Sequence, residues 1–446
     1  MSIRRELGPT LTIAIPVILA ELGWIATGVV DTVMVGPLGP EAISAAGVGT
    51  SMHMGFVVLG MGVLLGLDTL VSQAFGRKDL ADCHRWLFDG LTLAAIMTIP
   101  LTAVCALVWL AIPHLGFHPS VQPLLRTYFG ITLLSTPFLL LYAACRRYLQ
   151  GRHIVTPVMF ALISANIINA GLNWVFIHGH FGLPALGVAG SAWSTFFARL
   201  YMLAVLAFAV WWHNDGGLGD APRGIDRERL KRLLALGVPA ASQLGAEVGV
   251  FALATTMSGM LDPISSAAHQ IALEMAGLAF MIPLGLGSAG AVRVGHAVGA
   301  GERARAAAAG WTTIALGTGF MMLSGLTFLL IPNVIIGMFT KNQDVLRVGT
   351  SLLALASVFQ LFDGIQGVTT GTLRGLGNTH VPMKVNLIAH WLLGLPTSYV
   401  LCFILGWGVY GLWVGLSMGL IVTGIILLRV WQQEIRAYVT SPQPAR

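Results

Sequence analysis

The 446-residue chain carries few charges: 25 Lys and Arg plus 19 Asp and Glu make up only 10% of its residues, while 56% are apolar. Its mean hydropathy is +0.79. A soluble protein carries roughly 25% charged residues, so an ordinary cytosolic enzyme, a secreted disulfide scaffold and a disordered regulator are all excluded. The composition predicts a polytopic membrane protein.

The net charge of +6 does not indicate nucleic acid as a partner. In a membrane protein, an excess of Lys and Arg mostly reports orientation, because these residues gather in cytoplasmic loops. The four cysteines match no zinc-binding spacing, and we expect them to be reduced packing residues. They are Cys83, Cys105, Cys145 and Cys402.

Hydropathy and helix-breaking residues predict twelve membrane-spanning helices, because a helix needs about 20 mostly apolar residues to cross a bilayer. Alternation typical of strands is absent, so a β-barrel is not expected. The charged start of the chain leads into an apolar stretch with no cleavage site, which predicts an uncleaved first span. The predicted spans are 10–34, 47–72, 87–113, 122–146, 156–178, 187–212, 233–257, 265–292, 307–331, 347–371, 382–405 and 408–431.

The basic residues predict the orientation of these spans. Nearly all of them precede the first span, follow the last span, or fall around the loops that follow the even-numbered spans. The opposite side holds only Arg126, Lys341 and Arg347, and Arg199 falls within the sixth span. Both termini are therefore predicted to be cytoplasmic.

The chain divides into two similar halves. The hydrophilic stretch 213–231 is a predicted cytoplasmic linker between an N-terminal bundle, 1–212, and a C-terminal bundle, 232–446, with a short tail. Shifting the sequence by 223 residues places Pro16 on Pro239 and Pro40 on Pro263, and the register persists to Gly76 and Gly299. The predicted fold is therefore all-α, with two six-helix bundles related by a pseudo-two-fold axis, as in secondary transporters.

Several longer motifs lie at fixed places along these spans. They are VDTVMVGPLG at 30–39, AAHQIAL at 267–273, MIPLG at 281–285, VRVGHAVG at 292–299 and GTLRGLGN at 371–378. Together they resemble the multidrug and toxic compound extrusion (MATE) family, most closely its bacterial NorM-type branch. The resemblance covers nearly the whole chain, in order.

The resemblance implies an antiporter, not an enzyme, that exports cationic and often aromatic drugs. Export is expected to occur by alternating access in exchange for inward Na+ or H+, with no other cofactor. It also implies a multi-pass protein of the bacterial inner membrane that works as a monomer. Whether Na+ or H+ drives transport stays open, since carboxylates bind either ion.

Six acids lie inside apolar runs, where a charge costs about 2.5–3.5 kcal/mol and needs a reason. They are Glu21, Asp31, Asp68, Glu247, Glu274 and Asp363. Glu247 and Asp363 match the positions that the NorM-type branch uses for its coupling cation, and they are the candidate Na+ ligands. The alternative is a protonated carboxyl that bonds a neighbouring helix.

The other four acids have weaker assignments. Asp31 matches the acid of the first-span motif, and its expected neighbours are amides: Asn166, Asn169 and Asn173. Glu274 is a further coupling candidate that, with His269, could approach Glu247. We expect a structural role for Asp68. No motif indicates a role for Glu21.

A cavity for varied cationic drugs needs aromatic walls, because a cation gains about 0.5–2 kcal/mol over an aromatic face. Methionines could add adaptable walls. Pro16, Pro239, Pro283 and Pro396 are candidate hinges. The cavity candidates are Trp24, Phe56, Phe138, Trp174, Trp193, Phe362 and Trp391.

Two other functions remain to be weighed. A flippase for lipid-linked precursors also uses two bundles around a cavity, but a pyrophosphate cargo favours basic spans, and these spans are acidic. A membrane enzyme would need catalytic machinery, and neither a nucleophile elbow nor a His-Glu-x-x-His motif is present.

Overall fold

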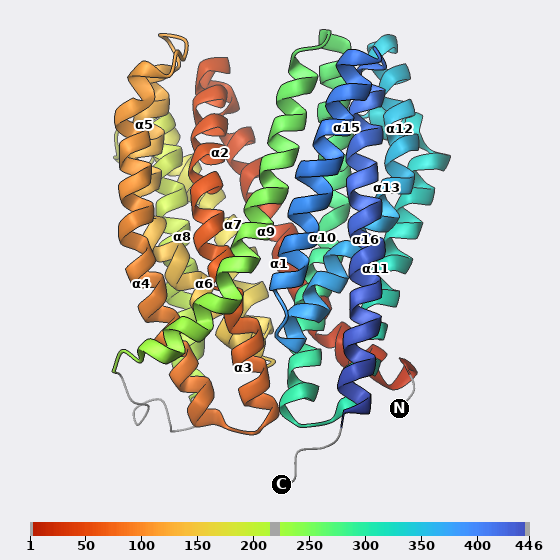
Figure 1. Cartoon of the computed structure of the whole chain (residues 1–446). Helices are drawn as coiled ribbons and strands as arrows, with labels where there is room; N and C mark the ends of the chain where they lie inside the picture. The colour runs from red at the N-terminus through yellow and green to blue at the C-terminus, as the bar shows by residue number, and fades with distance from the viewer. Residues whose placement is uncertain (1–2, 215–223, 442–446) are drawn as a thin grey trace. The chain divides into compact units, whose positions relative to one another are not determined.

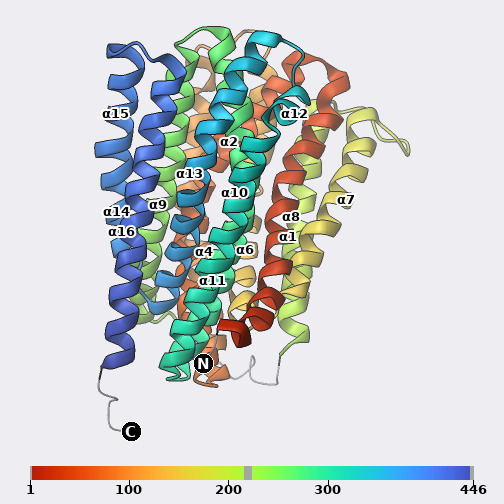
Figure 2. The same cartoon turned by 90° about the vertical axis from the view of Figure 1, so that its right-hand side faces the viewer.

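The computed structural model describes residues 3–214 and 224–441, and every regular element among them is helical (Figures 1 and 2). The central part of the predicted linker lies outside these residues. So do two of the basic residues on the predicted cytoplasmic side, Arg223 and Arg446. The prediction of an all-α fold is confirmed for the described chain.

The first half of the chain forms eight α-helices and two short 3₁₀ turns. These are α1 (Ile3–Val35), η1 (Gly36–Leu38), α2 (Pro40–Val63), α3 (Gly66–Gly76), α4 (Leu80–Ala111), η2 (Ile112–His114), α5 (Gln122–Leu133), α6 (Thr136–Gly151), α7 (Thr156–His178) and α8 (Val188–Trp212).

The second half forms eight α-helices and two π-helical segments. These are α9 (Arg227–Gly259), α10 (Pro263–Gly299), α11 (Arg303–Leu330), α12 (Pro332–Gly337), α13 (Gln343–Leu376), α14 (His380–Asn386), η3 (Leu387–Gly394), α15 (Leu395–Tyr399), η4 (Val400–Ile404) and α16 (Gly408–Thr440).

Each predicted span falls on one of these helices or helix pairs. Eleven described helices are long and apolar enough to cross a membrane, and the bent pair α5 and α6, which meet at 45°, makes the twelfth. The helices extend beyond the predicted spans: α10 runs over Pro263–Gly299, whereas hydropathy indicated 265–292. A helix continues through polar residues beyond its apolar run, and water or side chains can bond the free backbone groups at its ends. Hydropathy alone therefore underestimates helix length.

Side-chain caps mark several of the helix starts in the loops. Asp79 accepts from the backbone N–H of Asp82 at the start of α4, and Asn342 accepts from two N–H groups at the start of α13. Asp262 caps α10, where the Ser265 hydroxyl and then its backbone N–H hold the pKa of the Asp262 carboxyl below its ordinary value. These caps occupy donors that the first helical turn leaves free.

The described chain forms two compact units. The N-unit is residues 19–241, and the C-unit combines the first 18 residues with 242–446. Both boundaries fall inside long helices, α1 and α9, two residues after Pro16 and Pro239. The predicted linker range 213–231 overlaps the start of α9, and the first fifteen residues of that helix, Arg227 to Ala241, pack in the N-unit.

The N-unit has its core where α3, α4 and α6 meet. Leu67 from α3, Leu87 from α4 and Tyr142 from α6 are fully buried together, and α7 packs along α8 beside them. All four cysteines of the chain are free and buried, as expected of packing residues.

The C-unit is built around α13, which contacts α10, α11 and α16 (Figure 2). Close approach of α10 and α13 depends on glycine, because a Cβ on Gly371 would overlap the backbone of Gly287. A Cβ on Gly287 would lie 2.8 Å from the carbonyl oxygen of Gly367. Small residues at such crossings allow helix backbones to pack without intervening side chains.

The eleventh span departs from regular α-helix. Two π-helical segments, Leu387–Gly394 and Val400–Ile404, flank the short α15 that contains Pro396. π-Helical turns are rare and occur mostly where a helix is adapted to a function. The segment begins directly after Asn386.

Gly371→Ala should destabilise the C-unit, since the added methyl meets helix backbone that has no room to move. Overpacking of this kind costs about 1–3 kcal/mol. We expect the melting temperature of the purified protein in detergent to fall by several degrees.

The matched control is Gly277→Ala on α10, where a Cβ meets nothing within 4 Å. Alanine favours helix over glycine by about 1 kcal/mol, so this variant should be unchanged or slightly stabilised. Equal melting temperatures for the two variants would contradict the close packing at Gly371.

Candidate functional site

Glu247 is held by amide donors in the middle of α9. Its Oε1 accepts from Gln243 Nε2 at 3.2 Å, from Gln366 Nε2 on α13 at 2.6 Å, and from Asn386 Nδ2 at the end of α14. No basic side chain among the described residues pairs with this carboxyl. No described residue donates to the second oxygen, Oε2, so three helices of the C-unit meet at an acid that lacks a counter-charge within the described chain.

Asp363 lies on the same face of α13 as Gln366, one turn earlier. It is 8% exposed and has no hydrogen-bond or ion-pair partner among the described residues. Its carboxyl and that of Glu247 act on each other electrostatically. The structure therefore brings together the two acids that the sequence singled out for cation coupling.

Further oxygens without donors lie on the helices that meet at these acids. The Oε1 atoms of Gln366 and Gln360 and the Oδ1 of Asn386 lack hydrogen-bond partners among the described residues. Buried polar groups are normally paired, so these oxygens are available to a ligand that accepts electron pairs; the Oδ1 atoms of Asn166 and Asn173 in the described part of the N-unit are unpaired too. Hard cations prefer such oxygen ligands.

A site of this composition depends on amides as much as on acids. No group of three or more His, Cys, Asp or Glu suited to a metal exists among the described residues. A cation here would be held by Glu247 and Asp363 with amide oxygens completing its shell, which fits a monovalent ion or a proton better than a tightly bound divalent metal.

Asp31 forms a second polar site, on α1 in the N-unit. Its Oδ1 accepts from Asn173 Nδ2 at 2.9 Å and its Oδ2 from Thr195 Oγ1 at 3.1 Å. Asn169 accepts from Asn173 at 3.1 Å, and it is thus linked to Asp31 through that residue. Asn166 instead donates to the carbonyl oxygens of Gly23 and Leu162, so it contacts α1 away from the acid.

A buried arginine distinguishes this site from the one in the C-unit. Arg199 lies one turn after Thr195 on α8, where it donates to Ser135 Oγ at 2.6 Å and lies 3.3 Å from His53 Nδ1. Arginine has no acceptor, so His53 Nδ1 accepts and the imidazole is neutral. Arg199 acts electrostatically on Asp31, which gives the site a positive charge of its own.

Glu21 and Asp68 form ion pairs inside the N-unit. Glu21 pairs with buried Arg146 on α6, and Asp68 pairs with Arg147 on the same helix at 3.4 Å. From the sequence, Arg146 ends the predicted fourth span (122–146) and Arg147 begins the loop after it, yet α6 extends to Gly151 and buries both. Each of these acids therefore has a structural partner.

Glu274 and His269 do not contact Glu247. Glu274 is exposed on α10, where it accepts from Gln270 at 3.1 Å. Buried His269 accepts from Trp413 Nε1 at 3.0 Å and lies 3.2 Å from Thr255 Oγ1.

The aromatic candidates for a cavity are distributed over both units. Trp391 lies beside the Glu247 site, because its Nε1 donates to the carbonyl oxygen of Ala246 at 3.2 Å. Phe362 is adjacent to Asp363 and packs on Gly424. The other candidates lie elsewhere in the N-unit: Trp24 and Phe56 pack against core clusters, Phe138 and Trp193 each contact Phe196, and exposed Trp174 stacks on His180.

Sequence reasoning missed most of the residues that surround the acids. Gln243, Gln366, Asn386 and Thr195 are uncharged and are common in helices, so only tertiary contact identifies them. Arg199 carried a signal, since an arginine within an apolar span is expensive and needs a function.

The sequence matches the MatE family model over residues 16–175 and 239–400. It is 33% identical to a probable multidrug resistance protein NorM from Mesorhizobium japonicum over 97% of this chain and 95% of the relative. It is also 33% identical to the multidrug resistance protein NorM of Burkholderia vietnamiensis, over 99% and 97% of the two chains.

Solved structures share the fold at low sequence identity. The eukaryotic MATE transporter AtDTX14 gives a TM-score of 0.87 at 22% identity, covering 98% of this chain and 99% of that chain. An outward-facing multidrug resistance MATE family transporter of the MOP superfamily gives 0.88 at 17% identity, covering 97% and 96%. A MOP superfamily transporter from Pyrococcus furiosus, described as having a binding pocket of reverse polarity that suggests a different function, gives 0.86 at 18%.

Glu21→Gln should destabilise the protein more than Glu21→Gln combined with Arg146→Gln. The single change leaves the arginine buried without its counter-charge, which costs about 3–5 kcal/mol, whereas removing both charges costs less. Melting curves in detergent measure the difference. A double variant less stable than the single one would contradict a role for Glu21 as a structural ion-pair partner.

Proposed function

Because this chain belongs to the MatE family, we propose that it is a multidrug efflux antiporter, which exports cationic and aromatic compounds in exchange for inward Na+ or H+. The observation that carries this proposal is the pair Glu247 and Asp363. Partly buried Glu247 accepts from the amide nitrogens of Gln243 and Gln366, buried Asp363 acts on it electrostatically, and neither acid has a basic partner among the described residues. The names of the NorM relatives support multidrug compounds as the cargo.

Exchange follows from competition for this uncompensated negative charge. Either an inorganic cation or a cationic drug can neutralise the two carboxyls, and both together are less favourable because like charges repel. Binding of one ligand therefore promotes release of the other. Net transport also requires that each ligand bind the outward- and inward-facing states with different affinity, since a ligand shifts an equilibrium only by its differential affinity.

Trp391 and Phe362 are the aromatic residues best placed to contact a drug bound at this site. Trp391 is 37% exposed while its indole N–H is fixed on the backbone next to Glu247. An aromatic face held in this way offers a cation–π contact to an organic cation and nothing comparable to a small hydrated ion.

We infer that the Asp31 site of the N-unit does not itself bind the coupling ion. Its acid already has hydrogen bonds to both oxygens and the nearby charge of Arg199. Of the four acids predicted for coupling, Glu247 and Asp363 then bind the ion, while Asp31 and exposed Glu274 serve other roles.

The proposed location is the inner membrane of a bacterium, with both termini in the cytoplasm. Supporting this orientation, the described start of α1 and the end of α16 lie at the same end of the C-unit (Figures 1 and 2). At that end, Arg303 on α11 donates to the carbonyl oxygen of Ser441, and such basic residues favour the cytoplasmic side.

Glu247→Gln and Asp363→Asn should each abolish dye export from proteoliposomes, because each removes one of the two charges that the ions compete for. The wild-type protein should export dye under either an imposed Na+ gradient alone or a pH gradient alone, and the active gradient identifies the coupling ion.

The matched controls lie on the same helices. Glu228→Gln on α9 and Asp344→Asn on α13 remove exposed acids that pair with Lys231 and Arg347, and these variants should export normally. Unchanged export by the Glu247 and Asp363 variants, or no wild-type export under either gradient, would contradict the proposal.

Arg199→Gln should create a cation site at Asp31, because the acid loses the neighbouring positive charge. The melting temperature of the wild-type protein should change when Na+ is added or the pH is lowered. The Asp31→Asn variant should show the same change, and the Glu247→Gln/Asp363→Asn double variant should show none. Adding Arg199→Gln to that double variant should restore a response that Asp31→Asn removes. Exposed Arg126→Gln is the matched control, and a wild-type response that depends on Asp31 would contradict the assignment.

A further inference from the structure

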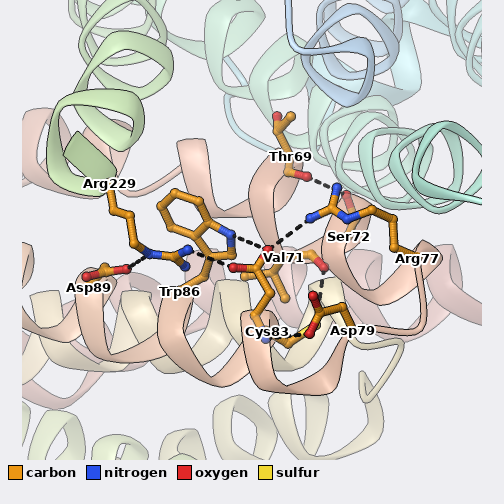
Figure 3. Close-up of polar contacts among 10 residues, drawn as sticks. Thr69, Val71, Ser72, Arg77, Asp79, Cys83, Trp86, Asp89 and Arg229 are labelled. Carbon is orange, nitrogen blue, oxygen red and sulfur yellow. Dashed lines mark hydrogen bonds and ion pairs between the residues drawn. The ribbon is translucent and has the colours of Figure 1, made fainter. Parts of the chain in front are cut away.

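The start of α9 packs in the core of the N-unit, and Arg229 adds a polar anchor to α4. Arg229 Nη1 lies 2.7 Å from Asp82 Oδ1 and Arg229 Nε lies 2.5 Å from Asp89 Oδ2. The guanidinium also stacks 3.7 Å from the centre of the Trp86 ring, and Figure 3 shows Arg229 beside Trp86 and Asp89. An arginine with two carboxylates and an aromatic face is strongly fixed in one orientation.

The start of α1 packs in the C-unit, and Glu6 is its polar anchor there. Glu6 pairs with Arg293 at the end of α10 and with Arg305 on α11, whose Nε lies 3.3 Å from Glu6 Oε1. Glu6 is 3% exposed and Arg293 is 4% exposed. Both long helices therefore begin with a partly or fully buried ion pair.

These two ion pairs are equivalent in the internal repeat, but their charges are reversed. Residue 229 minus residue 6 is 223, and residue 305 minus residue 82 is also 223. The repeat thus places Glu6 on Arg229 and Asp82 on Arg305. In the N-unit the anchoring residue, Arg229, is basic and its partners are acidic, whereas in the C-unit the anchoring residue, Glu6, is acidic and its partners are basic. Asp82 also pairs with Arg77, and Arg305 also pairs with Glu302.

The helices change units at equivalent places as well. The unit boundaries after Ile18 and after Ala241 are again 223 residues apart. The start of α1 thus packs with the second half of the chain, and the start of α9 packs with the first half. Each start is exchanged into the unit formed mainly by the other half.

A repeat protein offers an alternative to this exchange. Since the two halves have similar receptors, each helix start could pack on its own half. That arrangement would place Glu6 against Asp82 and Asp89, and Arg229 against Arg305, and every one of these contacts joins like charges. Only the exchanged arrangement joins opposite charges.

We propose that Glu6 and Arg229 are positioning residues whose opposite charges specify the exchange of α1 and α9 between the units. Partly buried ion pairs add little net stability, but a like-charge contact at such a site is costly, so the reversed pairs discriminate between the two arrangements. Two ion pairs that only stabilised the helix starts could have the same polarity in both units. The reversal of charge is needed only if the pairs also select the arrangement.

The exchange gives each polar site a mechanical connection to the other unit. Helix α1 carries Asp31 in the N-unit while Glu6 fixes its start in the C-unit. Helix α9 carries Glu247 in the C-unit while Arg229 fixes its start in the N-unit. If Glu247 binds the coupling ion, as in the proposed function on which this step rests, ion binding acts on a helix fixed at both ends in different units.

The test uses two sets of substitutions in the full-length protein. The first set is Arg229→Glu, Asp82→Arg and Asp89→Asn, and the second set is Glu6→Arg, Arg305→Glu and Arg293→Gln. Each set alone keeps opposite charges in the two pairs of the observed arrangement, at positions 229 and 82 and at positions 6 and 305. It also places opposite charges in the two pairs of the alternative arrangement, the own-half pairs at positions 6 and 82 and at positions 229 and 305. Combining the sets restores repulsion in both own-half pairs.

The yield of monodisperse protein from membranes measures assembly without depending on transport. We expect each set alone to lower the yield about three- to fivefold, the scale of one ion-pair preference. The combined set should recover yield above either set alone, although it carries twice as many substitutions. Dye export per folded protein then reports separately on the coupling proposed for Glu247.

Substitutions that only damage packing would behave in the opposite way. Independent defects at distant sites add, so the combined variant would yield less than either set alone. That order, or a yield from each set equal to wild type, would overturn the proposal. Glu6→Gln with Arg229→Gln is the neutral control, which removes both preferences and should lower the yield about as much as either set alone.

Discussion

A charge inside an apolar span has no water to stabilise it, and this constraint organises the polar interior of the protein. Several buried charges, in the spans and at their ends, meet the constraint by pairing. Arg146 is paired with Glu21, Arg147 with Asp68, and Glu6 with Arg293. The proposed ion site lies where such pairing is missing.

The two polar sites satisfy this constraint in different ways. Asp31 has donors on both oxygens and a nearby arginine, so it is balanced within the protein. Glu247 has amide donors on a single oxygen, Asp363 has no hydrogen-bond partner, and neither has a positive partner among the described residues. The N-unit thus holds a charge-balanced site and the C-unit a negatively charged one.

The fold by itself does not decide between these chemistries. Structures with TM-scores near 0.87 include MATE transporters and a transporter described as having a pocket of reverse polarity. Function in this architecture depends on which charges line the helices. The acids within the spans are the reason we propose a cationic cargo and not the anionic headgroup of a lipid-linked precursor.

The sequence by itself determined the number of spans, the internal repeat and the family, and it identified Glu247 and Asp363. These features are local or periodic: hydropathy needs only about 20 consecutive residues, and a repeat needs only a fixed offset. Acids in apolar runs are rare enough to be noticed without any structure.

Only the tertiary structure decided how those acids are balanced. The donors Gln366 and Asn386 lie more than a hundred residues from Glu247, and nothing in their own neighbourhood distinguishes them from other helical amides. The burial of Arg146 and Arg147 depended on how far α6 continues past its apolar run. The exchange of α1 and α9 also required contacts, because hydropathy assigns a residue to a span and not to the unit it packs in. The free energy of a buried charge is set by its neighbours in space. The sequence therefore shows where such a charge lies along the chain, but its role follows only from the tertiary structure.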